Sequence, residues 1–365
     1  MARCFERLGK VVESFVSDAY PGASIAIAYR GQVVFMGDYG YLQLTPAKRP
    51  IRPNALFDLA SLTKPLATSI ILMRLVEDGL IHLNQRVSDI LPEFSKTESG
   101  YNMVKDSVRL WMLLSHSSGL PPWLPLYKAS KSRNDVIEGA LKAQLTYYPG
   151  STVVYSDLNY IILTAVAERV SGERMDELFS GYVVEPLGLE RSLYNPLGKF
   201  TIDEIAATEV IGSEPLVGIV HDENARAMDG VSGHAGLFST SLEASKIALD
   251  LLNAVKGRDS RLLSRATVES MWRPWACGDT CYGLGWLVYR RGVTSSGGDL
   301  LSDSSFGHTG FTGTSIWVDV ERDLVIVLLT NRVHPTRENR RIDYARPIIH
   351  NVAVSEVHRC LRGIG

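Results

Sequence analysis

The sequence predicts an α+β protein in which one antiparallel sheet is built from both ends of the chain and flanked by the terminal helices. Strand-like runs occur near the start and in the last quarter of the 365 residues, whereas helical periodicity dominates the stretch between them. Strands at both ends with helices between them do not fit the βαβ alternation of a doubly wound parallel sheet. We expect a single domain over residues 1–365, with an α/β lobe of about 1–56 and 276–365 and an inserted all-helical lobe of about 57–275.

The first elements of the chain are predicted to be a helix and a hairpin. Residues 3–19 carry apolar side chains at helical spacing, so this helix is expected to pack on the sheet. Residues 23–29 and 32–37 are rich in strand-forming residues, and Arg30-Gly31 between them is typical of a tight turn.

An amphipathic helix is predicted from Ser61 to about Gly79. Apolar residues recur at helical spacing and form one stripe, which consists of Leu66, Ile70, Met73 and Val76. Pro65 cannot donate a hydrogen bond to the Ser61 carbonyl, so the first turn is expected to be irregular. Free backbone N–H groups at the helix start favour an oxyanion beside Ser61.

Further helices are expected over about 134–144, 157–170, 241–255 and 344–360. Ser156 or Asp157 would cap the second of these, and Thr240-Ser241-Leu242-Glu243 has the pattern of a capping box for the third. The Gly-rich segment 233–240 is expected to form a tight loop against the site.

Sheet signals return in the last quarter of the chain. Strands are predicted at 284–289, 306–310, 314–319 and 324–330, and the last two form a hairpin about Glu321-Arg322-Asp323. The polar run 294–305 is expected to be a flexible loop that could act as a lid.

The composition is that of an ordinary globular protein, with 45% hydrophobic and 21% charged residues and a formal net charge of −2. Without a basic field, nucleic acid and an anionic membrane surface are poor partners, and a small-molecule ester, amide or peptide substrate is favoured. No stretch approaches the roughly eighteen apolar residues of a membrane span. The N-terminal residues lack the apolar core of a secretory signal, so we expect a cytoplasmic location. The sequence does not determine the oligomeric state.

The chain has four cysteines, which do not decide the redox compartment. Cys277 and Cys281 are spaced for a small disulfide loop, and Cys4 and Cys360 lie in the two terminal segments. We expect free thiols, as in a reducing cytosol. The gap between Cys277 and Cys281 is longer than the usual zinc-ligand spacing, so no metal is expected there.

Ser61 and Lys64 form a Ser-x-x-Lys motif at the start of the predicted helix. Residues three apart lie on one helix face, so the hydroxyl and the amine come within hydrogen-bonding reach. A serine hydroxyl needs a neighbouring base to become a nucleophile, and a lysine desolvated on an apolar helix can take its proton. Most such pairs lie on solvated helix surfaces, so the motif needs support from elsewhere in the chain.

Two later motifs supply that support, Tyr155-Ser156-Asp157 and His308-Thr309-Gly310. Ser-x-x-Lys, a second motif with serine or tyrosine, and a final Lys-Thr-Gly form the signature of serine β-lactamases and penicillin-binding proteins. The chain therefore resembles that superfamily over nearly its whole length. It is most similar to class C enzymes, D-Ala-D-Ala carboxypeptidases and family VIII carboxylesterases. Further stretches similar to the family are 113–120, 233–240 and 331–337.

The resemblance implies a β-lactamase/transpeptidase-like fold with its active-site cleft between the sheet and the helical lobe. Ser61 would be the nucleophile and Lys64 its partner base. Tyr155 would share the proton relay, and we expect a neighbouring ammonium to lower the pKa of its phenol. Which of Lys64 and Tyr155 is the base stays open.

Five further residues are expected to bind substrate. Asp157 stands where class C relatives usually have asparagine; it can hold Lys64 but accepts rather than donates a hydrogen bond to a substrate amide. His308 replaces the lysine of Lys-Thr-Gly, which lowers the expected affinity for carboxylated substrates. Thr309 and Gly310 would shape the edge strand, and by resemblance the Phe311 N–H would be an oxyanion donor beside that of Ser61.

Other residue constellations are weak candidates for a site. His221, Asp222, Asp229 and His234 have no recognised ligand spacing, so neither a metal nor a cofactor is expected. No Gly-x-Ser-x-Gly is present, which excludes the α/β-hydrolase route to an esterase.

The sequence thus predicts a serine hydrolase that forms an acyl-enzyme at Ser61 on a carboxylic ester or a small acyl amide. One alternative is a D-Ala-D-Ala carboxypeptidase, a D-amino-acid peptidase or a weak β-lactamase. The alternative from another class is a non-catalytic penicillin-binding sensor that keeps the fold without turnover.

Overall fold

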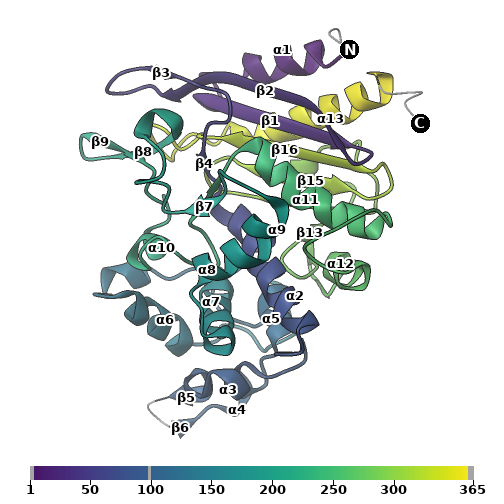
Figure 1. The fold of residues 1–365 in the computed structure, drawn as a ribbon. Coiled ribbons are helices and arrows are strands. Elements are labelled where there is room, and N and C mark those ends of the chain that lie inside the picture. The colour runs from purple at the N-terminus through teal and green to yellow at the C-terminus, as the bar shows by residue number, and fades with distance from the viewer. Residues whose placement is uncertain (1–3, 98–99, 361–365) are drawn as a thin grey trace.

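A computed structural model describes residues 4–97 and 100–360, and its centre is one antiparallel sheet (Figure 1). The order of its nine strands is β11-β12-β13-β14-β15-β16-β1-β2-β3. Their bounds are β1 Gly22–Tyr29, β2 Gln32–Gln43, β3 Arg49–Pro50, β11 Ala276–Cys277, β12 Cys281–Tyr282, β13 Leu287–Val288, β14 Ser305–Thr309, β15 Ser315–Asp319 and β16 Leu324–Thr330. Because β1 pairs with β16, the two ends of the chain meet in the sheet, as predicted.

The helices are α1 Glu6–Ser14, α2 Ser69–Glu77, α3 Val87–Ile90, α4 Met103–Asp106, α5 Leu110–Leu114, α6 Arg133–Lys142, α7 Asp157–Ser171, α8 Met175–Phe179, α9 Glu185–Leu187, α10 Glu223–Ala227, α11 Ser241–Val255, α12 Arg265–Trp272 and α13 Ile342–Cys360. Short 3₁₀ and π turns are η1 Ala60–Leu62, η2 Lys64–Thr68, η3 Pro92–Ser95, η4 Leu126–Lys128, η5 Ser180–Val184, η6 Ile202–Glu204 and η7 Ser295–Gly297. None of the described helices is long and apolar enough to cross a bilayer.

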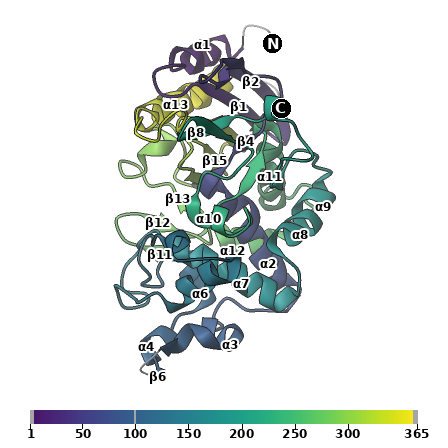
Figure 2. The same cartoon turned by 90° about the vertical axis from the view of Figure 1, so that its left-hand side faces the viewer.

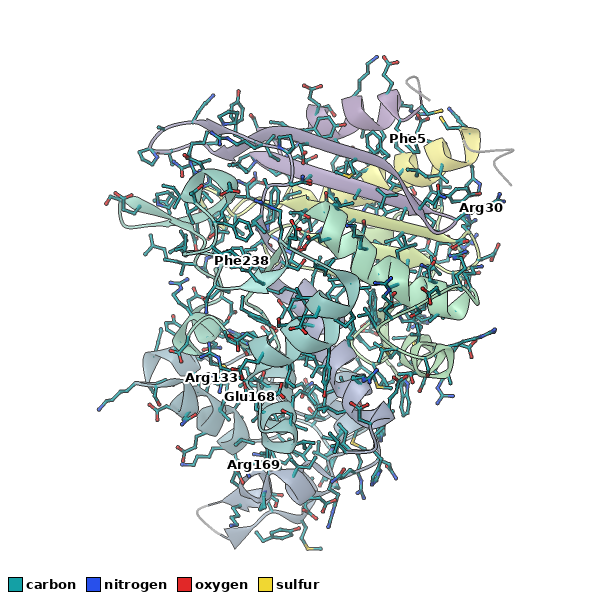
Figure 3. All side chains as sticks on the ribbon, viewed as in Figure 1. Phe5, Arg30, Arg133, Glu168, Arg169 and Phe238 are labelled. Atoms are coloured by element: carbon teal, nitrogen blue, oxygen red, sulfur yellow. A yellow bond between two sulfur atoms is a disulfide. The ribbon has the colours of Figure 1, made fainter. Side chains whose placement is uncertain are left out.

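The terminal helices α1 and α13 cover one face of the sheet, and α11 covers the other (Figures 1 and 2). Phe5, at the start of α1, stacks on Phe35 of β2 with ring centroids 4.9 Å apart (Figure 3). On the opposite face, α11 begins at Thr240, whose side chain accepts a hydrogen bond from the Glu243 N–H. The predicted flanking helices and the capped start of α11 are confirmed.

The inserted lobe lies below the sheet in both views and contains α2, α5, α6 and α7 (Figures 1 and 2). It is not all-helical as predicted, because it also contains short strand pairs that tie its loops together. These strands are β4 Phe57–Asp58, β5 Lys96–Thr97, β6 Gly100–Tyr101, β7 Leu193–Tyr194, β8 Ala207–Ile211, β9 Glu214–Val217 and β10 Leu237–Ser239. Arg133 of α6 forms an ion pair of 2.6 Å with Glu168 of α7, which fixes the helix that begins at Asp157 (Figure 3).

The predicted hairpins are present, but one predicted strand is shortened. Arg30 and Gly31 have φ of 50° and 83°, the left-handed pair that a two-residue hairpin turn requires. Of the strand expected at 284–289, only Leu287–Val288 pairs in the sheet. Gly285 has φ of 85°, and a Cβ there would lie 1.8 Å from the Ser69 Oγ, so the chain bends tightly over α2 instead.

The prediction that the loop at 294–305 acts as a lid over the site is wrong. The loop at 294–305 lies against α13, where the Asp299 N–H donates to the Asn351 Oδ1 (2.6 Å) and the Tyr289 hydroxyl donates to the Gly298 carbonyl (3.0 Å). This loop contributes no residue to the cleft described below.

The expectation of free thiols is wrong for Cys277 and Cys281, which form a disulfide. The reason is that β11 and β12 pair antiparallel with these two residues directly opposite each other. Cys4 and Cys360 are free.

Lys105 is a buried cation that gives the fold a pH-dependent stability. Its Nζ donates to the carbonyls of Leu141 and Ala143 at the end of α6, and burial lowers its pKa to about 8. Between pH 8 and the ordinary value of 10.5 the unfolded chain binds more protons at this residue, so its contribution makes unfolding less favourable as the pH rises. Urea unfolding of the wild type and of Lys105→Met at pH 8 and pH 10 should show a stability difference between them that changes with pH. A constant difference would contradict the assignment.

Candidate active site

Ser61 lies on an irregular turn rather than on a regular helix. The chain forms a 3₁₀ turn at Ala60–Leu62, a π turn at Lys64–Thr68, and only then α2. Pro65 has no N–H to donate to the Ser61 carbonyl, so the α-helical pattern cannot start there. The predicted irregular first turn is confirmed.

Asp58 holds this turn in place, and the sequence analysis missed it. Ala60 has φ of 48°, a strained value for a residue with a Cβ. Its N–H donates to the Asp58 Oδ1 (2.8 Å), while the His221 N–H donates to the Oδ2 (2.7 Å). Burial raises the pKa of Asp58 above its ordinary value, against the effect of these two N–H groups. A single acidic residue within the apolar run 55–62 was the signal available in the sequence.

Lys64 is fully buried and joins the parts of the site. Its Nζ lies 3.0 Å from the Ser61 Oγ, 2.9 Å from the His234 carbonyl oxygen and 2.7 Å from the Asp157 Oδ1. The first two contacts are hydrogen bonds donated by the ammonium, and the third is an ion pair with the carboxylate. Deprotonated, the same amine would direct its lone pair at the serine hydroxyl. The predicted approach of residues 61 and 64 is present.

Tyr155 lies beside this group, with the Lys64 Nζ 5.0 Å from the centroid of its ring. The His116 ring packs on its ring with the centroids 4.5 Å apart. Among the described residues its buried hydroxyl has no hydrogen-bond partner. Burial, and then the charge of Asp157, raise the pKa of the Tyr155 phenol well above its ordinary value. The expected lowering is therefore wrong, because desolvation outweighs the nearby ammonium, and the phenol stays protonated at neutral pH.

The unpaired hydroxyl leads to a prediction for Tyr155→Phe. The variant should lower kcat by about 10²- to 10⁴-fold, the contribution of a positioned proton-transfer group. It should cost less than about 1 kcal/mol of stability, because no buried partner loses a hydrogen bond. Thermal unfolding and turnover of a short-chain p-nitrophenyl ester would measure both. A large loss of stability with little loss of kcat would contradict this prediction.

Asp157 is the first residue of α7 and forms the ion pair with Lys64. Its side chain lines the cleft. The expectation that a carboxylate here can hold Lys64 agrees with this geometry. Since both oxygens of a carboxylate are acceptors, this position offers a substrate amide no donor.

His308 is neutral in this site. Its Nδ1 lies 2.8 Å from the Thr309 carbonyl oxygen, so the Nδ1 carries the proton and the Nε2 is an acceptor. Burial, and then the charge of Lys64, lower the pKa of His308 to about 3. The Nε2 is buried with no partner among the described residues, and the side chain lines the cleft. His308 therefore offers a substrate an acceptor and no positive charge.

The end of β14 packs directly on the turn that carries Ser61. A Cβ at Gly310 would lie 2.6 Å from the Leu59 carbonyl oxygen, so only glycine permits this approach. The Thr314 hydroxyl donates to that same oxygen (3.0 Å), while Thr309 and the half-exposed Phe311 line the cleft. The lack of a side chain at Gly310 thus allows the strand to pack on the backbone of the Ser61 turn.

Two buried arginines at the cleft were not identified from the sequence. The Arg332 guanidinium lies over the Phe311 ring (4.5 Å to the centroid), and its Nε donates to the Phe311 carbonyl (2.7 Å). The Arg346 Nη2 donates to the Gly310 carbonyl (2.9 Å), and burial lowers the pKa of Arg346 to about 10. For Arg332, the signal available in the sequence was its place in the stretch 331–337, which is similar to the family. Arg346 lies in a predicted helix, and nothing in the sequence marked it as a cleft residue.

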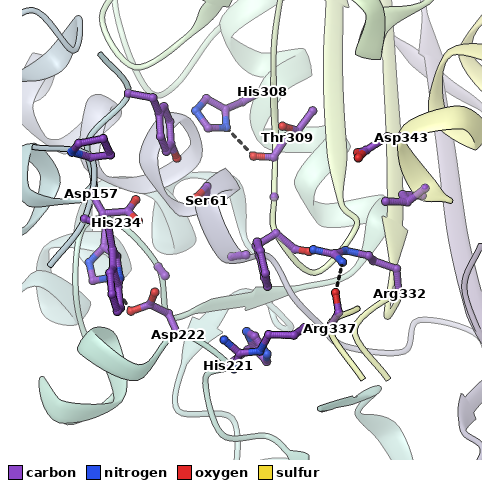
Figure 4. A pocket seen from close by; sticks show the side chains of 18 of the residues that line it. Ser61, Asp157, His221, Asp222, His234, His308, Thr309, Arg332, Arg337 and Asp343 are labelled. Carbon is purple, nitrogen blue, oxygen red and sulfur yellow. Dashed lines mark hydrogen bonds and ion pairs between the residues drawn. The ribbon is translucent and has the colours of Figure 1, made fainter. Parts of the chain in front are cut away.

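One cleft of about 780 Å³ is lined by Ser61, Tyr155, Asp157, His308 and the two arginines. Figure 4 shows Asp157, Asp222 and His234 on one side of Ser61, and Arg332 and Asp343 on the other. The cleft thus has an acidic wall and a cationic wall with the serine between them.

Both histidines considered for a metal face carboxylates instead. The His221 Nε2 lies 3.1 Å from the Glu209 Oε2, and the His234 Nε2 lies 2.7 Å from the Asp222 Oδ1. Within residues 4–97 and 100–360 no group of three or more His, Cys, Asp or Glu is arranged to hold a metal ion.

Comparisons with known proteins agree with the fold and motifs. The Beta-lactamase family model matches residues 1–350. The N-acetylmuramyl-L-alanine amidase of Bacillus subtilis is 34% identical, over 90% of this chain and 81% of its own. A putative D-alanyl-D-alanine carboxypeptidase of Salmonella typhi is 33% identical, over 92% of this chain and 84% of its own.

Solved structures are similar in fold at lower identity. EstCE1, a hydrolase with promiscuous acyltransferase activity, has a TM-score of 0.74 and 22% identity, covering 94% of this chain and 98% of its own. The family model spans nearly the whole chain, and Ser61, Tyr155 and His308, from three separate sequence motifs, line one cleft. The chain therefore belongs to the Beta-lactamase family and is a serine hydrolase of that family.

Proposed function

We propose that the protein hydrolyses an acyl amide through an acyl-enzyme at Ser61 and releases an α-amino acid. The observation that carries this proposal is the 3.0 Å contact between the Lys64 Nζ and the Ser61 Oγ at a cleft with one cationic wall. The hydroxyl attacks the carbonyl carbon and gives its proton to neutral Lys64. By family resemblance, the backbone N–H groups of Ser61 and Phe311 hold the oxyanion.

The second half of the reaction returns the proton to the leaving group. Tyr155, protonated and adjacent to Lys64, passes a proton to the amine nitrogen as the C–N bond breaks and recovers one from Lys64. Water then attacks the acyl-enzyme, loses a proton to Lys64 and releases the acid with Ser61 restored. Lys64 serves as the base because the phenol, whose pKa burial raises, stays protonated.

An α-amino acid is proposed as leaving group for two reasons. The names of both curated relatives describe amides whose nitrogen belongs to alanine. In addition, the Arg332 side chain packs on the Phe311 ring and donates hydrogen bonds to the carbonyls of Arg337 and Asn339 (both 2.8 Å). These contacts position the guanidinium before a substrate carboxylate binds. Arg332 would thus supply the charge that His308 lacks.

A carboxylic ester is the second candidate substrate. Neutral His308 presents an acceptor rather than a cation near Ser61, which suits an uncharged leaving group. The two candidates share the acyl-enzyme, so only the substrate comparison separates them.

The test compares three substrates with one acyl group: an N-acyl-L-alanine, the same compound with its carboxyl group amidated, and the p-nitrophenyl ester. Arg332→Met should lower kcat/KM for the free carboxylate by about 10- to 100-fold, as for loss of a charge-assisted hydrogen bond, and much less for the amidated compound. Arg340→Met, an exposed arginine at the cleft, is the matched control and should have little effect.

Three results would count against the proposal. Turnover of the ester alone would exclude the amide, and an equal loss on both amides would mean that Arg332 acts through the Phe311 strand. A permanent fluorophosphonate adduct on Ser61, without turnover of any substrate, would favour the sensor.

A further inference from the structure

The acidic wall of the cleft carries an aromatic side chain that the proposed reaction does not use. Trp123 lines the cleft with Pro122, and 41% of its surface is exposed. A large aromatic side chain at a cleft presents an apolar face to a ligand.

The loop that carries Trp123 is anchored on both sides of it. Before it, the Asp157 N–H donates to the Pro122 carbonyl (2.9 Å). After it, the Asn224 amide accepts from the Tyr127 N–H (3.0 Å) and donates to the Leu124 carbonyl (2.9 Å). The backbone on both sides of the indole is therefore ordered before any ligand binds, which lowers the ordering cost of binding.

Asp222 is held by the same short helix that anchors this loop. Its Oδ1 accepts from the Ala225 N–H (2.8 Å) at the start of α10 and faces the His234 Nε2 (2.7 Å). Its side chain also lines the cleft and is 21% exposed. Since Asn224 belongs to α10, the loop backbone beside Trp123 and the Asp222 carboxylate are anchored to the same helix.

The acids on this wall already face basic groups. Asp157 pairs with Lys64 (2.7 Å), Glu223 with Arg337 (2.7 Å), and Asp222 with His234. A ligand ammonium would therefore find no uncompensated negative charge on this wall. The carboxylate oxygens can still accept further hydrogen bonds, which an apolar acyl chain would not donate. Neutral hydroxyl groups would donate hydrogen bonds to these carboxylates without adding a charge.

The geometry points to a sugar subsite on the acyl side of the cleft: Trp123 stacks on the C–H face of a pyranose ring, and Asp222 accepts its hydroxyl groups. The electron-rich face of an aromatic ring attracts polarised C–H groups, and a carboxylate accepts hydroxyl protons. The opposite wall carries Arg332, so the acyl group and the released amino acid lie on opposite sides of Ser61 (Figure 4). Only this assignment of sides rests on the proposed function.

The first test measures binding without turnover. Ser61→Ala protein is titrated by calorimetry with N-acetylmuramic acid and with lactic acid, which is the same acid without the sugar. The sugar acid should bind at least tenfold more tightly, and adding Trp123→Ala should remove that advantage. Tyr148→Ala, an aromatic residue that is 74% exposed and outside the cleft, should retain it. Equal affinity for both acids, or an unchanged advantage with Trp123→Ala, would overturn the subsite.

The second test measures turnover in the otherwise unaltered enzyme. N-acetylmuramyl-L-alanine should exceed N-lactoyl-L-alanine in kcat/KM, and Trp123→Ala should reduce that ratio at least tenfold. Trp123→Tyr, which keeps an aromatic ring, should preserve most of the ratio, and the control Tyr148→Ala should leave it unchanged. A ratio that is the same in the wild type and Trp123→Ala would overturn the subsite. If neither amide is hydrolysed while the binding test succeeds, the proposed function fails and the subsite stands.

Discussion

Ser61→Ala should lower kcat/KM by on the order of 10⁵-fold for every substrate that the protein turns over. The reason is that the hydroxyl forms the covalent bond to the acyl group, and the rest of the machinery cannot act without it. Stopped assays with p-nitrophenyl ester and amide substrates measure the loss. Intact-protein mass spectrometry after treatment with a fluorophosphonate should show one adduct on the wild type and none on the variant.

A neighbouring serine supplies the control for Ser61→Ala. Ser69 lies at the start of α2, is fully buried, and has an Oγ without a hydrogen-bond partner among the described residues. Ser69→Ala should therefore leave both turnover and the adduct unchanged. An adduct that persists on Ser61→Ala would place the nucleophile elsewhere and refute the proposed function.

Lys64→Met should lower kcat by about 10³- to 10⁴-fold, because it removes the group that takes the Ser61 proton. The variant should also lose about 1–3 kcal/mol of stability, since the Asp157 carboxylate would lose its ion-pair partner. Kinetics and denaturant unfolding of the same preparation measure the two effects.

A double variant separates catalysis from stability. Lys64→Met with Asp157→Asn removes both members of the ion pair, so it should recover most of the lost stability while kcat stays low. Recovery of kcat together with stability would show that Lys64 acts only by supporting the fold, and the proposed proton transfer would then be wrong.

The sequence could predict features that depend on neighbours along the chain. The Arg30-Gly31 turn, the Thr240 cap and the irregular turn after Pro65 follow from the dihedral preferences and donors of the residues themselves. The spacing of Ser61 and Lys64 likewise places their side chains within reach, because three residues make about one helical turn.

Features that depend on burial could not be predicted in this way. The sign of the Tyr155 pKa shift was wrong because the ring is enclosed by His116 and other residues from distant segments, so desolvation outweighs the charge of Lys64. The prediction of a lid failed for a related reason, since contacts with Asn351 hold that loop against α13.

By itself, the sequence determined the order of the elements, the family motifs and the local pairing of Ser61 with Lys64. The tertiary structure alone decided that Asp58 supports the strained Ala60, that His308 is neutral, and that Arg332 stands opposite the acidic wall. The physical reason is that dihedral preferences act between neighbours in the chain, whereas desolvation and charge act between neighbours in space.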